Sequence, residues 1–247
     1  MTMVVATAAA VWFAQTSAGA SEGWGPLPPD LARSAASVGV VAIASLAPAA
    51  VLMLTAYVRI SIVLALLRQA LGSPQIPGNQ VVMMLSILLT ILVMKPVADV
   101  VAERAIRPFA AGELDHAQAF AAGAEPVKQF MVKQIVACGN ERYLIELHDL
   151  AEPPETRTHQ PEYLDELPLR VVAAAFLISE INVALWMGFA IYLPFLVIDL
   201  VTAAVLAAMG LYLLPPAQVA IPLKLMVFVL AEGWWLVAQT LLRSFES

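Results

Sequence analysis

Long uncharged runs of apolar residues fill most of this chain, and single charged residues separate them. The runs are Val38–Val58, Ile60–Leu67, Val81–Met94, Ile181–Ile198, Leu200–Leu223 and Leu225–Ala231. One polar block, at about residues 99–170, lies between the third run and the fourth. A water-soluble fold cannot hide runs of this length. The pattern therefore predicts an all-α integral membrane protein built from helical hairpins, which acts as an oligomer.

The same pattern divides the chain into predicted segments. They are a signal peptide at 1–20, a linker at 21–37, a first helical hairpin at 38–98, an acidic extracytoplasmic helical subdomain at 99–170 and a second helical hairpin region at 171–247. The linker is expected to be exposed because proline and glycine recur along it.

In the first hairpin, the apolar pattern predicts a helix from about Val38 to Leu71 that only Pro48 and Arg59 interrupt. At 1.5 Å per residue such a helix would reach about 45–50 Å, which exceeds the roughly 30 Å hydrocarbon core of a bilayer. The next run, Val81–Met94, has fourteen residues before Lys95-Pro96. That length is short for a membrane span and is typical of a helix buried in protein.

The polar block contains two segments with helical periodicity. Apolar residues recur at helical spacing from Val127 to Ile135, with lysines on the opposite side. A second helix is predicted at Glu141–Leu150, where Leu144, Leu147 and Leu150 share one face. The stretch 152–167 is predicted to be a loop. We therefore expect a small helical subdomain in water.

The carboxy-terminal third is apolar but interrupted. Glu180 and Asp199 are nineteen residues apart, a helical distance of about 28 Å that would place them at opposite faces of a bilayer. Pro215-Pro216 is expected to end a helix because two backbone donors are missing there. A last helix is predicted at Ala217–Arg243. Its Trp234-Trp235 pair either forms an interfacial belt or packs inside protein.

Composition supports membrane placement and excludes several functions. Hydrophobic residues make up 61% of the chain and charged residues 13%, against about 45–50% and about 25% in soluble domains. A net charge of −6 without a basic stripe argues against a nucleic-acid partner. Cys138 and the three histidines lack zinc-site spacing, and no catalytic or phosphate-binding motif is present. We predict no cofactor, no metal site and no enzymatic activity.

Six charges interrupt the apolar runs and cannot face lipid without cost. They are Arg59, Lys95, Glu180, Asp199, Lys224 and Glu232. They could relay ions, or they could form buried ion pairs that fix the register of helices within or between subunits. We favour pairing because no repeat of the secondary-transporter kind is present. Lys224 is expected to pair with Glu180 or Asp199.

Three stretches of the chain share ordered motifs with a known family. They are LTAYVRI through LLRQALG to PGNQ at 54–80, RPF with PVKQFMVKQ at 107–134, and LPLR, AFLISEI, LPFLVID, MG, PP, LKL and GW in order at 167–234. In these motifs the sequence resembles the FliP family of flagellar export proteins, whose injectisome counterparts are called SctR. The resemblance covers residues 48–245 without a large gap.

The resemblance implies a function that composition cannot. Family members assemble as several copies in a ring, with two smaller membrane proteins, into the export gate of the bacterial inner membrane at the flagellar basal body. Unfolded export substrates pass through its centre. This chain would therefore be a structural pore-forming subunit of the type III protein export gate. The family's helices are drawn out of the bilayer into that assembly, which agrees with the irregular helix lengths predicted above.

The resemblance also implies a pore constriction at Met209, Gly210, Leu211, Tyr212, Leu213 and Leu214. Family members commonly carry several methionines there, and this chain keeps only Met209. A hydrophobic constriction is still expected, without the compliance of methionine. The alternative is a purely structural role, in which these side chains pack against neighbouring helices. Lys95 departs from the family pattern, which usually has a small residue at that position.

Other functions and a choice of branch stay open at this point. A secondary transporter or ion channel subunit is the main alternative, and a passive membrane anchor for the acidic block is a weaker one. The signal-like amino terminus and the sizeable polar block favour the flagellar branch over the injectisome branch.

The amino terminus resembles a secretory signal. An apolar stretch, Val4–Ala14, precedes Ala18-Gly19-Ala20, a small-residue cleavage pattern. An uncleaved apolar tail is the alternative, since no Lys or Arg precedes the stretch. Cleavage would leave Ser21 outside the cytoplasm, the loop with Arg68 inside and the acidic block outside, in agreement with the positive-inside rule.

We therefore predict that amino-terminal sequencing of the mature protein begins near Ser21. Recovery of intact Met1 from membranes would contradict both the cleavage and the orientation that follows from it.

Overall fold

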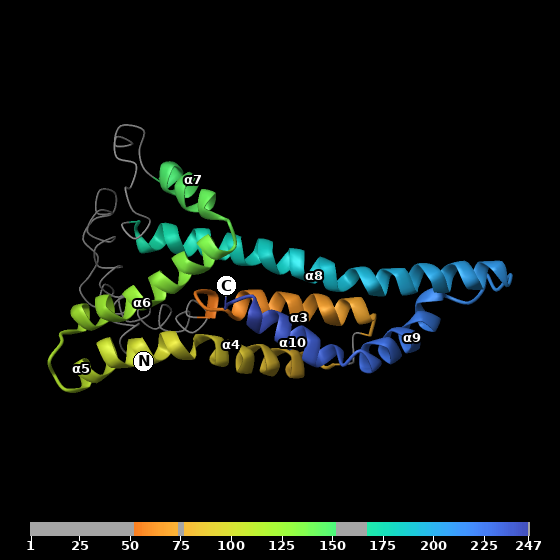
Figure 1. The fold of residues 1–247 in the computed structure, drawn as a ribbon, viewed down its shortest axis with the longest axis horizontal. Helices are drawn as coiled ribbons and strands as arrows, with labels where there is room; N and C mark the ends of the chain where they lie inside the picture. The colour runs from red at the N-terminus through yellow and green to blue at the C-terminus, as the bar shows by residue number, and fades with distance from the viewer. Residues whose placement is uncertain (1–51, 74–76, 152–166, 247) are drawn as a thin grey trace, which may run out of the picture. The chain divides into compact units, whose positions relative to one another are not determined.

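The computed structural model describes residues 52–73, 77–151 and 167–246 (Figure 1). The predicted signal peptide, the linker and most of the predicted loop at 152–167 lie outside these residues. Every regular element within them is a helix, which confirms the all-α prediction. The elements are α3 (Tyr57–Leu71), α4 (Asn79–Val101), the π-helix η1 (Ala102–Ile106), α5 (Arg107–Ala110), α6 (His116–Ala137), α7 (Glu141–Ala151), α8 (Leu169–Ala208), α9 (Pro216–Leu230) and α10 (Gly233–Arg243).

Two compact units make up the described residues. The smaller contains residues 52–54 and 96–130, and the larger contains residues 55–95 and 131–246. In the smaller unit, α6 packs closely on the segment that precedes α5. A Cβ atom on Gly123 would lie 3.4 Å from Cβ of Ala105, an ordinary contact distance. These two helical segments therefore approach each other at small residues.

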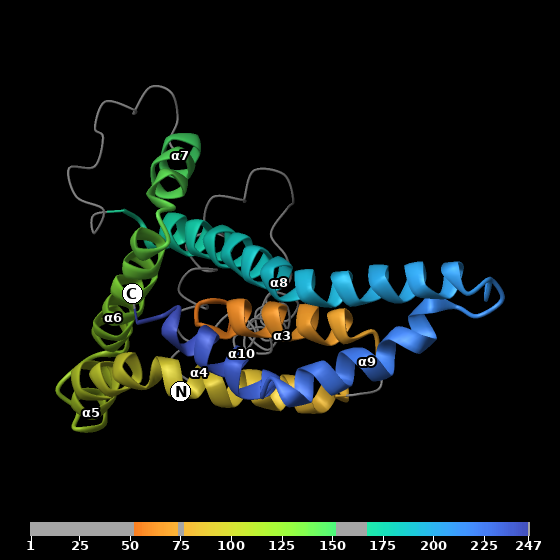
Figure 2. The same ribbon diagram turned by 45° about the vertical axis from the view of Figure 1, so that its right-hand side comes forward.

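In the larger unit, α3 and α8 form the main helix pair and lie side by side in both views (Figure 1 and Figure 2). Ile60, Val63, Leu64 and Leu67 of α3 recur at helical spacing and are all buried. Phe176 of α8 is buried as well. α9 packs against α8, and α10 against α9. The core of this unit therefore lies along α3, and α8 is the longest helix that packs against it.

The amino-terminal helix prediction needs two corrections. The helix expected from about Val38 to Leu71, with only Pro48 and Arg59 interrupting it, is broken at residues 54–56, and α3 begins at Tyr57; residues 38–51 of this prediction lie outside the described residues. The run that was expected to end at Lys95-Pro96 instead continues to Val101, with Pro96 inside α4. A proline within an apolar helix removes only one backbone hydrogen bond, and such helices tolerate that loss when neighbouring groups compensate.

The helices predicted in the polar block are found at 116–137 and 141–151. α7 matches its predicted span, but its buried face differs from the expected leucine stripe. Leu144 and His148 are buried, whereas Leu150 is 76% exposed. The spacing of three residues between the leucines correctly predicted a helix. Which residues of α7 are buried depends on its contact with α8.

The carboxy-terminal region also differs from its prediction in one place. The single helix expected at Ala217–Arg243 is two helices, α9 and α10, with a bend of 64° between them. Glu232 at the break adopts the left-handed conformation, with φ of 51°. Gly233 permits the bend, because a Cβ there would lie 2.1 Å from the ring of Phe228. The close approach of that ring requires glycine at this position.

Within the described residues, two helical stretches are long and apolar enough to cross a membrane, Asn79–Ala110 and Leu169–Ala208. The bent pair α9 and α10 would make a third if it counts as one span. Membrane-spanning capacity thus lies in α4 and α8, and α3 is too short to qualify. The run of fourteen residues judged short for a span belongs to a 32-residue helical stretch.

The contact between α3 and α8 generates the first structural prediction. A Cβ on Gly188 of α8 would lie 2.1 Å from Cδ1 and 3.0 Å from Cβ of Leu66. Gly188→Ala is therefore expected to destabilise the protein by about 1–3 kcal/mol through overpacking. The measurement is the midpoint of thermal unfolding in detergent.

Gly123→Ala is the matched control, because it lies inside a helix with ordinary contacts around it. It should leave stability unchanged or raise it by up to about 1 kcal/mol through helix propensity. Equal effects of the two substitutions would show that the α3–α8 distance is not limiting.

Candidate functional site

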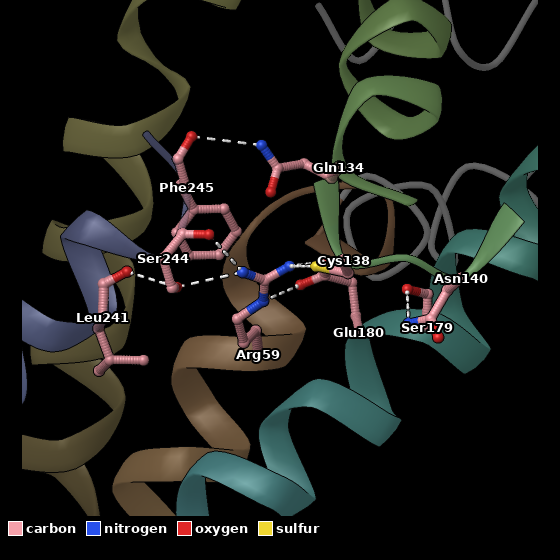
Figure 3. Close-up of polar contacts among 9 residues, drawn as sticks. All are labelled: Arg59, Gln134, Cys138, Asn140, Ser179, Glu180, Leu241, Ser244 and Phe245. Carbon is pink, nitrogen blue, oxygen red and sulfur yellow. Dashed lines mark hydrogen bonds and ion pairs between the residues drawn. The ribbon is translucent and has the colours of Figure 1, made fainter. Parts of the chain in front are cut away.

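Arg59 in the first turn of α3 is completely buried and lies at the centre of a polar cluster (Figure 3). Its Nε donates to Oε2 of Glu180 at 2.8 Å, and its Nη2 donates to Oε1 of the same carboxylate at 2.5 Å. Glu180 on α8 is completely buried too. This two-pronged arrangement is the strongest geometry for an arginine–carboxylate pair.

The remaining donors of Arg59 reach two other parts of the larger unit. Nη1 donates to the backbone oxygen of Ser244 at 2.9 Å and to its hydroxyl at 3.1 Å. Nη2 also donates to the sulfur of Cys138 at 3.4 Å. All five N–H groups of the guanidinium therefore have a partner. The ring of Phe245 lies 4.1 Å from the guanidinium carbon and adds a cation–π contact.

Amide side chains extend this cluster on either side (Figure 3). Asn140 donates to the hydroxyl of Ser179 at 2.8 Å, next to Glu180. Gln134 donates to the backbone oxygen of Phe245 at 3.3 Å. One guanidinium and its neighbours thus join α3, α6, α8 and the residues after α10.

Lys224 of α9 forms a second buried centre at the other end of α3. Its Nζ donates to Oδ2 of Asp199 on α8 at 2.7 Å and to the backbone oxygen of Ala70 at 2.9 Å. Ala70 is in the last turn of α3, where carbonyl oxygens have no partner within the helix. A cation there also complements the negative end of the helix dipole. Lys224 therefore both pairs with Asp199 and caps α3.

These contacts account for four of the six charges singled out in the sequence. The partner of Lys224 is Asp199, one of the two expected, and Glu180 pairs with Arg59. Asp199 keeps 34% of its side chain exposed. Lys95 and Glu232 are exposed on the single chain. Their burial against another subunit stays a prediction.

The residues at 209–214 form a tip between α8 and α9. α8 ends in a Schellman motif, in which the N–H of Gly210 donates to the oxygen of Ala207 and the N–H of Leu211 to that of Leu206. Gly210 has φ of 72°, which glycine adopts without strain. Pro215 and Pro216 begin α9, so the helix cannot continue through the tip.

All six tip residues are exposed on the single chain. Tyr212 is 80% exposed and Leu213 is 99% exposed. These two side chains therefore have little contact with the helices that the structure describes in the same chain. Pro215-Pro216 was expected to end a helix, and α8 does end ahead of these prolines, at Ala208, where Gly210 closes the Schellman motif.

Sequence reasoning missed the partners that complete the Arg59 cluster. Ser244 and Phe245 follow the last helix and carry no motif, and Cys138 was considered only as a zinc ligand. Among the described residues no group of His, Cys, Asp or Glu could hold a metal ion; His159 lies outside them. The chemistry available is charge neutralisation and hydrogen bonding, which hold helices in register.

Comparisons with known proteins give a consistent result. The model of the FliP family matches residues 40–241. A flagellar biosynthetic protein FliP of Pectobacterium carotovorum is 45% identical over 81% of this chain and 74% of its own length. One of Caulobacter vibrioides is 44% identical over 85% and 75%, and one of Aquifex aeolicus is 40% identical over 83% and 82%.

The two ion pairs generate a comparative prediction. Glu180→Gln leaves a fully buried guanidinium without its counter-charge, and should cost about 3–5 kcal/mol of stability. Asp199→Asn should cost less, about 1–3 kcal/mol, because Lys224 keeps the oxygen of Ala70 and the site is partly exposed. Thermal unfolding in detergent, followed by tryptophan fluorescence, measures both.

Exchanging the charges of Lys224 and Asp199 distinguishes a structural ion pair from a role in ion transport. Lys224→Ala should reduce the amount of assembled protein, and the exchange Lys224→Asp with Asp199→Lys should restore part of it. If Lys224→Ala assembles normally but abolishes activity, the pair has a transport role instead.

Proposed function

Since the chain belongs to the FliP family, we propose that it is a structural, pore-forming subunit of the flagellar-type protein export gate, through which unfolded export substrates pass. The family relationship supports the flagellar export apparatus as its setting. The related proteins carry the name flagellar biosynthetic protein. The neutralised ion pairs support a structural role, because each charge already has a partner within the chain.

The observation that carries the pore proposal is the exposed apolar tip at 209–214. Irregular backbone at membrane depth is tolerated only where protein buries it or where it lines a cavity. Leu211, Tyr212, Leu213 and Leu214 are exposed on the single chain. Repeated around a ring of copies, they would form a dewetted constriction that excludes ions and yields to a passing polypeptide.

The exposed surface of α8 supports assembly with other proteins. Large exposed apolar residues extend along it from Ile178 to Val205. At 1.5 Å per residue this band is about 40 Å long, which exceeds the roughly 30 Å hydrocarbon core. Lipid alone cannot cover it, so protein is needed over the remainder. Copies of this chain in a ring, together with two smaller membrane proteins of the gate, are the proposed partners.

We place the assembly in the bacterial inner membrane, at the flagellar basal body, with the acidic block on the extracytoplasmic side. α4 and α8 have the length and the apolar character that membrane insertion requires. The proposed orientation rests on the signal-like amino terminus and on the position of Arg68, which the structure places in the last turn of α3 and not in the loop that follows it.

Truncation of the tip tests the pore proposal. The triple substitution Leu211→Ala, Tyr212→Ala and Leu213→Ala is expected to give assembled complexes that leak small ions, because the apolar plug is lost. Ion flux into vesicles containing the purified complex is the measurement. Val229→Ala with Leu230→Ala, which removes comparably exposed apolar side chains from α9, is the control and should stay ion-tight.

Other outcomes favour other functions. Less assembled complex without a leak would show that the tip packs against neighbouring helices. Normal assembly with an ion-tight membrane would contradict both a constriction and a packing role. Solute flux by the unsubstituted chain alone in liposomes would favour a transporter or an ion channel subunit.

A further inference from the structure

The end of α3 lies beside α9 (Figure 2). A groove with two chemically different lobes is found there. The larger lobe, of about 590 Å³, has apolar walls that include Leu196, Leu200 and Ala203 of α8 and Ile221 of α9. The smaller lobe, of about 340 Å³, is lined by Ala65, Arg68, Gln69, Gly72 and Ser73. Gln69 and Gly72 belong to both lobes, so the lobes adjoin.

Arg68 supplies the charge of the smaller lobe. Its Nη1 donates to the side-chain oxygen of Asn79 at 3.3 Å in an exposed contact. The other N–H groups of the guanidinium have no partner in the part of the chain that the structure describes. The remaining charges at the groove, Lys224 and Asp199, neutralise each other. The groove therefore presents one net positive charge, on a fork of donors that matches a phosphate group.

We propose that this groove binds an anionic phospholipid, with its phosphate at Arg68 and an acyl chain in the apolar lobe. Basic pockets between membrane helices are suited to such headgroups. Gln69 and Ser73 add hydrogen-bonding side chains beside the phosphate position. A zwitterionic lipid fits less well, because its own cation would lie next to Arg68. The site requires only that the chain lies in a membrane, so it does not depend on the export function.

Because the groove has one charged lobe and one apolar lobe, a lipid fits it better than a helix from another protein. A phospholipid has a compact charged end and a long apolar end, and the lobes adjoin in that order. A transmembrane helix would cover both lobes with side chains of one apolar character and leave the donors of Arg68 without partners. Such donors are costly once buried. Docking of a second copy is therefore the competing outcome of the test.

The headgroup is tested with the full chain, extracted in mild detergent in whatever assembly it forms. Native mass spectrometry compares retention of phosphatidylglycerol and phosphatidylcholine with the same acyl chains. The unsubstituted chain should prefer phosphatidylglycerol. Arg68→Gln should reduce this preference about tenfold, the size expected from losing one charge-assisted contact. Arg142→Gln removes an exposed arginine of α7, outside the groove, and should leave the preference unchanged.

The acyl-chain lobe is tested with Arg68 intact. Ala203→Trp should fill the apolar lobe and displace phosphatidylglycerol, whereas Ala204→Trp, at an exposed position outside the lining, should retain it. Equal retention in both tryptophan variants overturns the proposal. An unchanged headgroup preference in Arg68→Gln overturns it as well. If Arg68→Gln changes the mass of the assembly and not its lipid content, the groove is a contact between subunits.

Discussion

The buried guanidinium of Arg59, whose five N–H groups all need hydrogen-bond acceptors, determines how the helices of the larger unit pack together. Taking Arg59 out of water costs several kcal/mol, and only complete pairing offsets that cost. Its partners come from α8, from the residue after α6 and from the two residues after the last helix. Any shift of these elements by one helical turn would leave donors unpaired. The cluster therefore contributes specificity of register more than net stability.

The second ion pair complements the first at the opposite end of α3. Lys224 connects the last turn of α3 to Asp199, so α3 is fixed to its neighbours near both of its ends. Between them the backbones of α3 and α8 approach closely, because Gly188 has no side chain to separate them. α9 also packs against α8, and the tip at 209–214 joins these two helices. The two ion pairs and Gly188 therefore fix how α3, α8 and α9 pack together.

The sequence was most informative where local chemistry decides the structure. The charges within the apolar runs correctly predicted ion pairs. Exposing Arg59, Glu180, Asp199 or Lys224 to lipid without a partner would cost too much free energy. The two prolines at 215 and 216 correctly predicted that a helix ends before them. Each of these features depends on a few neighbouring residues or on a charge that must be neutralised. Such features can be predicted from the sequence without knowledge of the fold.

Features that depend on tertiary contacts were not predictable. Pro96 looked like the end of a helix, yet the missing hydrogen bond is tolerated and α4 continues. The break at Glu232 occurs because Phe228 covers Gly233, a contact that no local pattern reveals. Ser244 and Phe245 gained their role only because the chain end reaches the guanidinium. Which leucines of α7 are covered likewise depends on what packs against it.

The part of α8 beyond Asp199 has a mechanical consequence. From Asp199, where Lys224 ties α8 to the end of α3, to Met209 the chain runs about 15 Å at 1.5 Å per residue, so a tilt of about 15° at this ion pair moves the far end by about 4 Å. That displacement is close to the width of a methionine or leucine side chain. The ion pair and the tip thus form a short lever, in which a rotation at one polar contact shifts a distant apolar rim.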